Sequence, residues 1–327
     1  MIEYPHLAQI AFSVTDLART HDFYHRVLGF EPAGGTGAFR GRLTSAAQGI
    51  PDVVATCWWL VDQREYMQLE LFQFDSPAVR PLPADWRPCD TGYTSVGLHV
   101  TNFDTALERL AAAGVALISK VEGRSGRRRV CIRDPEGVLL ELMEEDLCAG
   151  GSVARPAIPV VARSVTVSVP DLSKARRFWV DTLGLEEAAD VTLHVPEHEA
   201  QWGLEGARRE SLLLWADNFL VELVRYDQPV GRPWPADYRL SDQGLLNVAF
   251  GFRDVEALHA AYDRVIAAGY RCNTKPLEIG SGGVVYCNDD QGFSVELLCS
   301  SGAAMDQAVG FIPRPEGTLT PANRLGG

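Results

Sequence analysis

The chain has 327 residues, of which 46% are hydrophobic and 22% charged, and this composition suits about two globular domains of ~150 residues each. Its formal net charge of −13 argues against nucleic acid or an anionic membrane surface as a partner, because both select basic surfaces. No apolar run approaches the ~20 residues of a membrane-spanning helix, and the N-terminal residues show no signal-peptide pattern. We therefore expect a cytoplasmic protein, and its seven scattered cysteines, with no Cys-x-x-Cys pair, predict reduced thiols.

The sequence repeats itself once. Ser-Val-Thr-Asp-Leu at 13–17 returns as Ser-Val-Pro-Asp-Leu at 168–172, a shift of 155 residues. Leu-Glu-Leu around Glu70 returns as Val-Glu-Leu around Glu222, and the turn at 134–137 returns at 289–292. A repeat of this length indicates duplicated domains. The predicted organisation is an N-terminal domain at 1–148, a linker at 149–162, a C-terminal domain at 163–300 and a poorly ordered tail at 301–327.

The order of elements is the same in each half of a copy. In the first half, a strand at 9–14 leads to a helix that Asp16 caps and Gly29 ends, and strands at 53–61 and 66–74 follow. The second half has a strand at 95–100, a helix at 104–113 and a last strand at 138–143. The chain therefore contains four β-α-β-β-β modules, and its predicted fold class is α+β.

These motifs resemble the vicinal oxygen chelate superfamily. The evidence is Val-Thr-Asp-Leu followed by Phe-Tyr and Val-Leu-Gly-Phe, the Leu-Glu-Leu strand, and Asp-Pro-Glu-Gly-Val-Leu-Leu-Glu-Leu at 134–142. The superfamily includes glyoxalase I, extradiol dioxygenases, methylmalonyl-CoA epimerase and fosfomycin- or bleomycin-resistance proteins. The resemblance implies that paired modules curl into cup-shaped sheets with helices outside. It also implies metal ligands on the first and last strands of each module.

Carried over onto this chain, the ligand positions are Gln9 and Glu70, Ser95 and Glu141, Ser164 and Glu222, and Asn247 and Glu296. None is histidine, so no copy offers the two imidazoles and one carboxylate of a ferrous oxygenase at these positions. Glutamates together with an amide suit a divalent metal ion. The sequence leaves the identity of the ion open among Zn, Ni, Mn, Mg and Fe, and it also leaves open that no metal is bound. His99 lies on the same strand face as Ser95 but ~13 Å further along.

We place the site in the N-terminal copy, because only that copy has a histidine near its ligand positions. The predicted metal ligands are Gln9, Glu70, Glu141 and His99. Glu141 and Glu70 are the predicted catalytic residues, and His99, Trp59 and Tyr93 are the predicted substrate-binding residues. The alternative is pairing of modules across the two domains, which unites Gln9 and Glu70 with Asn247 and Glu296.

Structural roles compete with these assignments. Glu70 and Glu141 are also explained as salt-bridged acids, since an unpaired carboxylate is costly among apolar neighbours. Several tryptophans suggest an apolar or aromatic ligand surface, although core packing explains each one equally well. Pro196 separates two histidines, and we predict a loop for 194–199. Three arginines at 127–129 are predicted to form a solvated loop before a strand.

The preferred function is that of a metal-dependent isomerase or lyase. Its expected substrate is a small oxygenated molecule, with an aromatic body as one option, that chelates the ion through two oxygens. The ion stabilises an enolate while a glutamate of the site transfers the proton. The alternatives are extradiol ring cleavage, which the absent histidines disfavour, and a binding or resistance protein that has lost its metal. The expected partner is a small molecule, and a homodimer is left open.

Overall fold

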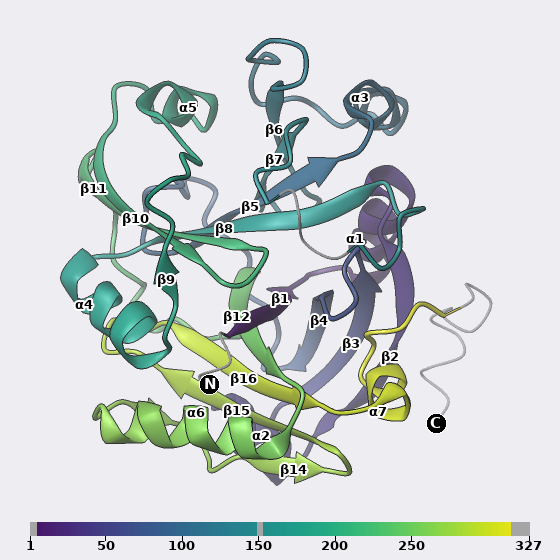
Figure 1. Ribbon diagram of the computed structural model, residues 1–327, viewed down its shortest axis with the longest axis vertical. Helices are drawn as coiled ribbons and strands as arrows, with labels where there is room; N and C mark the ends of the chain where they lie inside the picture. Colours follow the sequence, from purple (N-terminus) through teal and green to yellow (C-terminus); the bar gives the residue numbers. More distant parts are fainter. Residues whose placement is uncertain (1–4, 149–152, 315–327) are drawn as a thin grey trace.

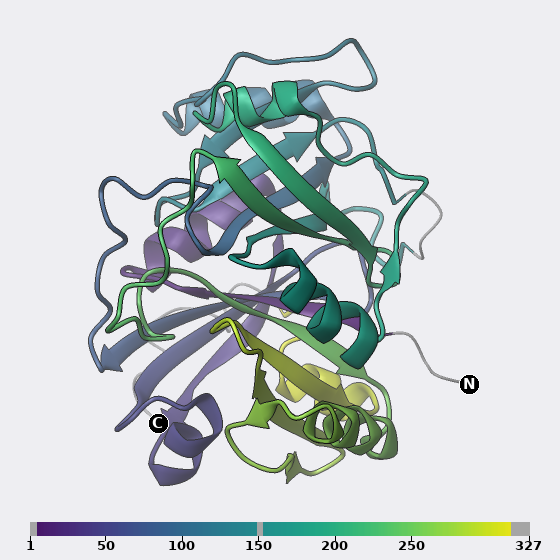
Figure 2. The same cartoon turned by 90° about the vertical axis from the view of Figure 1, so that its left-hand side faces the viewer.

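The structure is a computed structural model that describes residues 5–148 and 153–314. Its strands form two sheets, which lie one above the other in Figure 1 and, turned by 90°, in Figure 2. Sheet A has nine strands, with the path β13-β15-β16-β12-β1-β4-β3-β2 and β14 attached to β15. Sheet B has seven, in the order β6-β7-β5-β8-β11-β10-β9.

The four modules account for nearly all elements. Module 1 contains β1 (His6–Ser13), α1 (Leu17–Asp22), the π-helix η1 (Phe23–Leu28), β2 (Glu31–Arg40), α2 (Arg42–Gln48), β3 (Val54–Val61) and β4 (Gln68–Ser76). Module 2 contains β5 (Gly92–Val100), α3 (Phe103–Ala112), β6 (Arg129–Arg133) and β7 (Leu139–Met143). Module 3 contains β8 (Val160–Ser168), α4 (Leu172–Arg176), the π-helix η2 (Arg177–Thr182), β9 (Glu186–Glu187), α5 (Pro196–Gln201), β10 (Arg208–Trp215) and β11 (Leu220–Gln228). Module 4 contains β12 (Gly244–Phe252), α6 (Val255–Ala267), β13 (Arg271–Cys272), β14 (Leu277–Ile279), β15 (Gly282–Asn288) and β16 (Ser294–Ser300), and α7 (Ala303–Ala308) follows it.

The repeated Asp-Leu motif begins a helix in both copies, as predicted. The side chain of Asp16 accepts a hydrogen bond from the Arg19 amide at 3.0 Å, and Asp171 accepts one from the Lys174 amide at the same distance. Gly29 ends the first helix with φ +93, a left-handed conformation that favours glycine. The predicted α+β class with four modules is confirmed, although module 2 has only an isolated bridge between Leu117 and Ile132 at the place of its second strand.

The pairing of modules differs from the expected one. Strand β1 pairs antiparallel with β12, which joins modules 1 and 4 in sheet A, whereas β5 pairs antiparallel with β8, which joins modules 2 and 3 in sheet B. Consecutive modules 2 and 3 therefore lie next to each other in sheet B, and the first and last modules pair with each other in sheet A. The prediction that the N-terminal copy alone forms the cup that holds the site is therefore wrong.

Two similar loops tie the halves together. Arg80 of the first half donates from Nε to Asp242 at 2.7 Å, and Arg232 of the second half donates from Nε to Asp90 at 3.0 Å. Each arginine is preceded by a strand of its own half and reaches an aspartate of the other. The exchange is reciprocal and follows the internal repeat.

Of the remaining predictions, some agree with the structure and others do not. All seven cysteines are free thiols, as predicted. None of the helices in the described ranges has the length and apolarity needed to cross a membrane. Residues 301–314 differ from the predicted poorly ordered tail, because α7 forms there and Phe311 is fully buried against Tyr66. The rest of that tail, 315–327, and part of the predicted linker, 149–152, lie outside the described residues.

Candidate functional site

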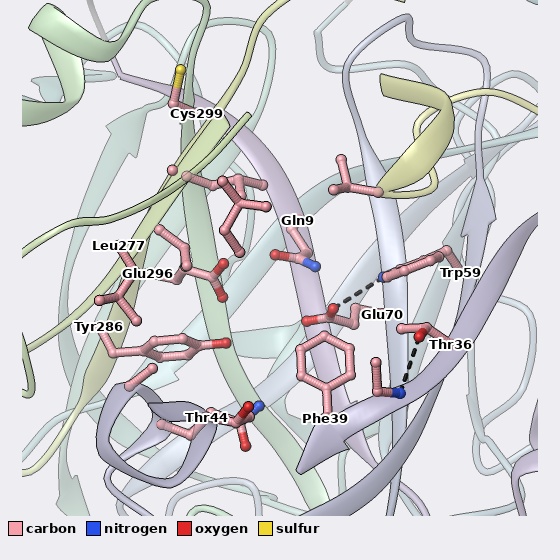
Figure 3. A pocket seen from close by; sticks show the side chains of 18 of the residues that line it. Gln9, Thr36, Phe39, Thr44, Trp59, Glu70, Leu277, Tyr286, Glu296 and Cys299 are labelled. Atoms are coloured by element: carbon pink, nitrogen blue, oxygen red, sulfur yellow. Dashed lines mark hydrogen bonds between the residues drawn. The ribbon is translucent and has the colours of Figure 1, made fainter. Parts of the chain in front are cut away.

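Four central strands of sheet A bring together the side chains that could hold an ion. Gln9 on β1 and Glu296 on β16 share a register position, since both are paired with Ala249 of β12. Gln9 is also opposite Gln68 on β4, and Glu70 follows two residues later on the same face. Figure 3 shows Gln9, Glu70 and Glu296 facing one another across a cavity. We call this cavity and these three side chains site A.

Site A is an apolar cavity of about 310 Å³ with a small polar centre. Its walls come from sheet A, α2, β14 and α7, and they include Phe39, Trp59, Leu277, Tyr286 and Met305. The volume is near the lower end of the range for small-molecule pockets, roughly 300–1,000 Å³. Among the described residues that line it, the only formally charged ones are Glu70 and Glu296, and none is Lys, Arg or His.

Glu70 is held by donors on one side. Its Oε1 accepts hydrogen bonds from Trp59 Nε1 at 3.0 Å and from Cys57 Sγ at 3.4 Å. Burial raises the pKa of Glu70 to about 7, although these donors and Gln9 act in the opposite direction. Burial and the nearby charge of Glu70 also raise the pKa of Glu296, which Tyr286 and Asn247 counter only in part. Two acids that resist ionisation together are a common feature of functional sites.

Several oxygens of site A have no hydrogen-bond donor. Gln9 Oε1, Gln68 Oε1 and Glu296 Oε2 are buried acceptors without a partner. Unpaired buried acceptors are rare and costly in folded proteins, so their accumulation at one place requires an explanation. A divalent cation that prefers oxygen ligands would satisfy Gln9 Oε1, Glu296 Oε2 and the Glu70 carboxylate together. The donor set therefore fits the metal ion that the family resemblance implies. Among the described residues, three or more His, Cys, Asp or Glu side chains do not gather anywhere in a metal-binding arrangement, and site A relies on amides beside its two acids.

The equivalent place in sheet B has a different character. Ser164 and Glu141 both pair with Gly97 in sheet B, just as Gln9 and Glu296 both pair with Ala249 in sheet A. Glu222 on β11 occupies the position that corresponds to Glu70 on β4. Here His194 lies between the two acids, with Nδ1 2.6 Å from Glu222 and Nε2 3.0 Å from Glu141. We call Glu141, His194, Glu222 and the arginines around them site B.

Arginines complete the charge balance of site B. Arg209 pairs with Glu222 at 2.9 Å and with Glu199 at 2.5 Å, and Arg129 lies 3.4 Å from Glu141. Despite burial, His194 and Arg209 lower the pKa of Glu222 to about 2, and His194 lowers that of Glu141. Counted as ionised, Arg129, His194 and Arg209 balance the two acids of site B together with the adjoining Glu199. By contrast, the described residues that line site A include two acids and no cationic side chain.

The structure separates the residues that the sequence analysis placed in one metal site. Gln9 and Glu70 lie in site A, but Glu141 lies in site B, and His99 is on β5 and lines neither site. One ion cannot contact all four, so their grouping was wrong, because it assumed that modules 1 and 2 share a cup. The alternative cross-domain set, with Asn247 and Glu296, describes the observed arrangement.

The predicted substrate-binding residues are also dispersed. Trp59 lines site A, while Tyr93 lines a separate cavity between the two arginine-bearing loops and donates a hydrogen bond to the Ser294 carbonyl at 2.7 Å. Arg129, predicted in a solvated loop, begins strand β6 and points inward, because Glu141 and the Leu193 carbonyl accept from it. Residues 196–201 form helix α5 rather than a loop, since proline is tolerated in the first helical turn.

Two features of the sites escaped the sequence analysis. Tyr286 belongs to a strand that the repeats do not mark, and its hydroxyl points into site A. The role of His194 depends on contacts with acids of two different modules. In the sequence, only its proximity to His198 and Glu199 indicates a functional residue.

Comparisons with known proteins agree with the fold. The sequence profile of the glyoxalase/bleomycin resistance protein/dioxygenase superfamily matches residues 8–132 and again residues 162–297. No curated protein matches the sequence. A candidate dioxygenase from Bacillus subtilis has a similar structure, with a TM-score of 0.64, 15% identity, and coverage of 97% of this chain and 94% of the other. Glyoxalase I from Zea mays superimposes with a TM-score of 0.61 at 16% identity, over 93% of this chain and 94% of the other.

Proposed function

The chain belongs to the glyoxalase/bleomycin resistance protein/dioxygenase superfamily, and on that premise we propose that site A is the active site of a metal-dependent isomerase or lyase. The observation that carries the proposal is the pair of buried, uncompensated acids, Glu70 and Glu296, beside acceptors that have no donor. Such a set is costly unless protons or a cation occupy it.

The two glutamates have different surroundings, which suggests different roles. Glu70 is fixed by Trp59 and Cys57, so it serves best as a positioned ligand beside Gln9. Glu296 retains a free Oε2 and a raised pKa, so it can accept a proton from substrate carbon and return it near neutral pH. A bound divalent ion supplies Lewis-acid stabilisation of negative charge on the substrate oxygens.

The lining of site A supports a neutral substrate. A carboxylate or phosphate on the substrate would be buried beside two acids with no cationic side chain among the described lining residues. Leu43 and Ile279 are 64% and 63% exposed at the rim, so the approach to the cavity is apolar as well. We infer an α-hydroxycarbonyl compound with a small aromatic or aliphatic body, which contacts Phe39 and Trp59.

Proton exchange tests this function directly. The protein is loaded with Mn²⁺ and then washed into Mg²⁺ for NMR, and 2-hydroxyacetophenone in D₂O serves as a neutral probe. We expect deuterium to enter the carbon next to the carbonyl, and Glu296→Gln to abolish the exchange. Glu141→Gln is the matched control, because this acid lies in site B and its loss leaves exchange intact. Exchange that proceeds equally in the Glu296→Gln variant contradicts the proposal.

Ligand binding without catalysis is the second candidate. The mostly apolar walls of site A would hold a hydrophobic molecule even without a reaction. Binding of 2-hydroxyacetophenone, measured by quenching of Trp59 fluorescence, without any deuterium exchange favours this candidate over the isomerase or lyase.

A further inference from the structure

Sites A and B occupy equivalent positions in the two sheets. In sheet A, Gln9 and Glu296 flank Ala249, and in sheet B, Ser164 and Glu141 flank Gly97 with the same pairing directions. In sheet A, Gln9 pairs with Gln68 of the parallel strand β4, and Glu70 lies two residues beyond Gln68. In sheet B, Ser164 pairs with Leu220 of the parallel strand β11, and Glu222 lies two residues beyond Leu220. Both places therefore present two carboxylates from corresponding strands.

The two sites differ in what lies between the carboxylates. The amides of Gln9 and Asn247 in sheet A are replaced in sheet B by the shorter side chains of Ser164 and Ser95. The imidazole of His194 lies between Glu141 and Glu222, and its side chain is only 2% exposed. It also makes an edge-on contact with Trp202, with ring centroids 4.6 Å apart.

His194 contacts the acids as a cation. A carboxylate can only accept a hydrogen bond when it is ionised, so contacts of 2.6 Å and 3.0 Å to two different acids require both ring nitrogens to donate. Burial opposes this charge, but Glu222 and Glu141 raise the pKa of His194 to about 9. His198, on α5, has a pKa lowered to about 4 by burial and by Arg129, so it adds no charge near neutral pH.

The backbone of the segment that carries His194 is clamped from both sides. Arg129 donates to the Leu193 carbonyl at 2.7 Å, and Arg209 donates to the His194 carbonyl at 3.2 Å. Each of these arginines also contacts one of the two acids that bind the ring. The arginines that hold this backbone therefore also pair with the two acids whose charges the ring balances.

We propose that site B is a divalent-metal site closed by the chain's own cation: the His194 ring occupies the position between Glu141 and Glu222 that an ion occupies between Glu70 and Glu296 in site A. The comparison with site A rests on the proposed function, but the occupancy of site B by His194 does not. The protein consequently binds one divalent ion per chain, and removal of the His194 ring opens a second site.

Counting bound Mn²⁺ by electron paramagnetic resonance of the free ion tests this inference. We expect one ion per chain in the wild type, two in His194→Ala, and one again in His194→Ala/Glu141→Gln. His194→Gln is a second variant in case the alanine variant fails to fold, because it retains volume and supplies an amide oxygen like that of Gln9. Circular dichroism and thermal melting verify folding of every variant.

The outcomes separate this inference from the proposed function. Zero ions in the wild type and one in the His194 variants contradict the metal in site A but support the closed site B. One ion in the wild type and one in both folded His194 variants overturns the inference while leaving site A intact. Two ions in the wild type overturn it as well.

Discussion

Replacement of corresponding glutamates in the two sheets should change stability in opposite directions. In the metal-free protein, Glu70 is buried, 4% exposed, and lies near a second acid without a cation, so its ionisation is costly. A pKa raised from 4.5 to about 7 corresponds to roughly 3 kcal/mol at about 1.4 kcal/mol per pH unit. Because the folded-state pKa is raised, this cost is absent below pH ~4.5, grows as the pH rises, and is complete above pH ~7.

We therefore expect Glu70→Gln to stabilise the metal-free protein by about 1–3 kcal/mol at pH ~8, and by less than about 1 kcal/mol at pH ~5. Glu222→Gln should instead destabilise the protein by roughly 3–5 kcal/mol, because it leaves His194 and Arg209 with an incomplete set of buried partners. Urea denaturation at both pH values, in the presence of a chelator, measures both effects.

Divalent ions provide the control. Saturating Mn²⁺ should raise the free energy of unfolding of the wild type but not that of the Glu70→Gln variant. A ligand stabilises a folded protein only if it binds to it, and the variant lacks one of the proposed ion ligands. Equal destabilisation by Glu70→Gln and Glu222→Gln at pH ~8 would refute the reasoning, since it would mean that Glu70 is paired as well as Glu222.

Three further outcomes follow from named contacts. The pKa of His194 exceeds its ordinary 6.5, so its contribution to stability is complete below pH ~6.5 and roughly 3 kcal/mol are lost as the pH rises through about 9, which urea denaturation across pH ~6–10 measures. Trp59→Phe removes the hydrogen bond to Glu70 at 3.0 Å and should weaken Mn²⁺ binding about tenfold, whereas Trp58→Phe, whose ring packs on His21, should not. After anaerobic loading with ferrous iron, an oxygen electrode should detect no catechol-dependent oxygen uptake, because no described residue lining site A is histidine.

The sequence was sufficient for the local structure of the modules. Asp16 and Asp171 begin helices for a chemical reason that a sequence displays, since each side chain caps the amide three residues later. The internal repeat also identified Glu70, Glu141, Glu222 and Glu296 as corresponding acids of the last strands, and the strand registers agree with that correspondence.

Which modules share a sheet could not be derived in the same way. The first strands of all four modules have similar patterns, so the pairing of β1 with β12 instead of β5 depends on contacts between residues far apart in the chain. The error in pairing placed Gln9 beside Glu141, when Gln9 in fact lies beside Glu296. His194 was equally hidden, because its role requires acids from two modules and has no counterpart in the repeat.

We propose that the acids between modules 1 and 4, and not those between modules 2 and 3, hold the functional ion. Isothermal titration of Mn²⁺ into Glu296→Gln and Glu141→Gln, side by side with the wild type, tests it most directly. We expect Glu296→Gln to lose binding and Glu141→Gln to keep the wild-type affinity. Loss of binding in Glu141→Gln with full binding in Glu296→Gln would contradict it.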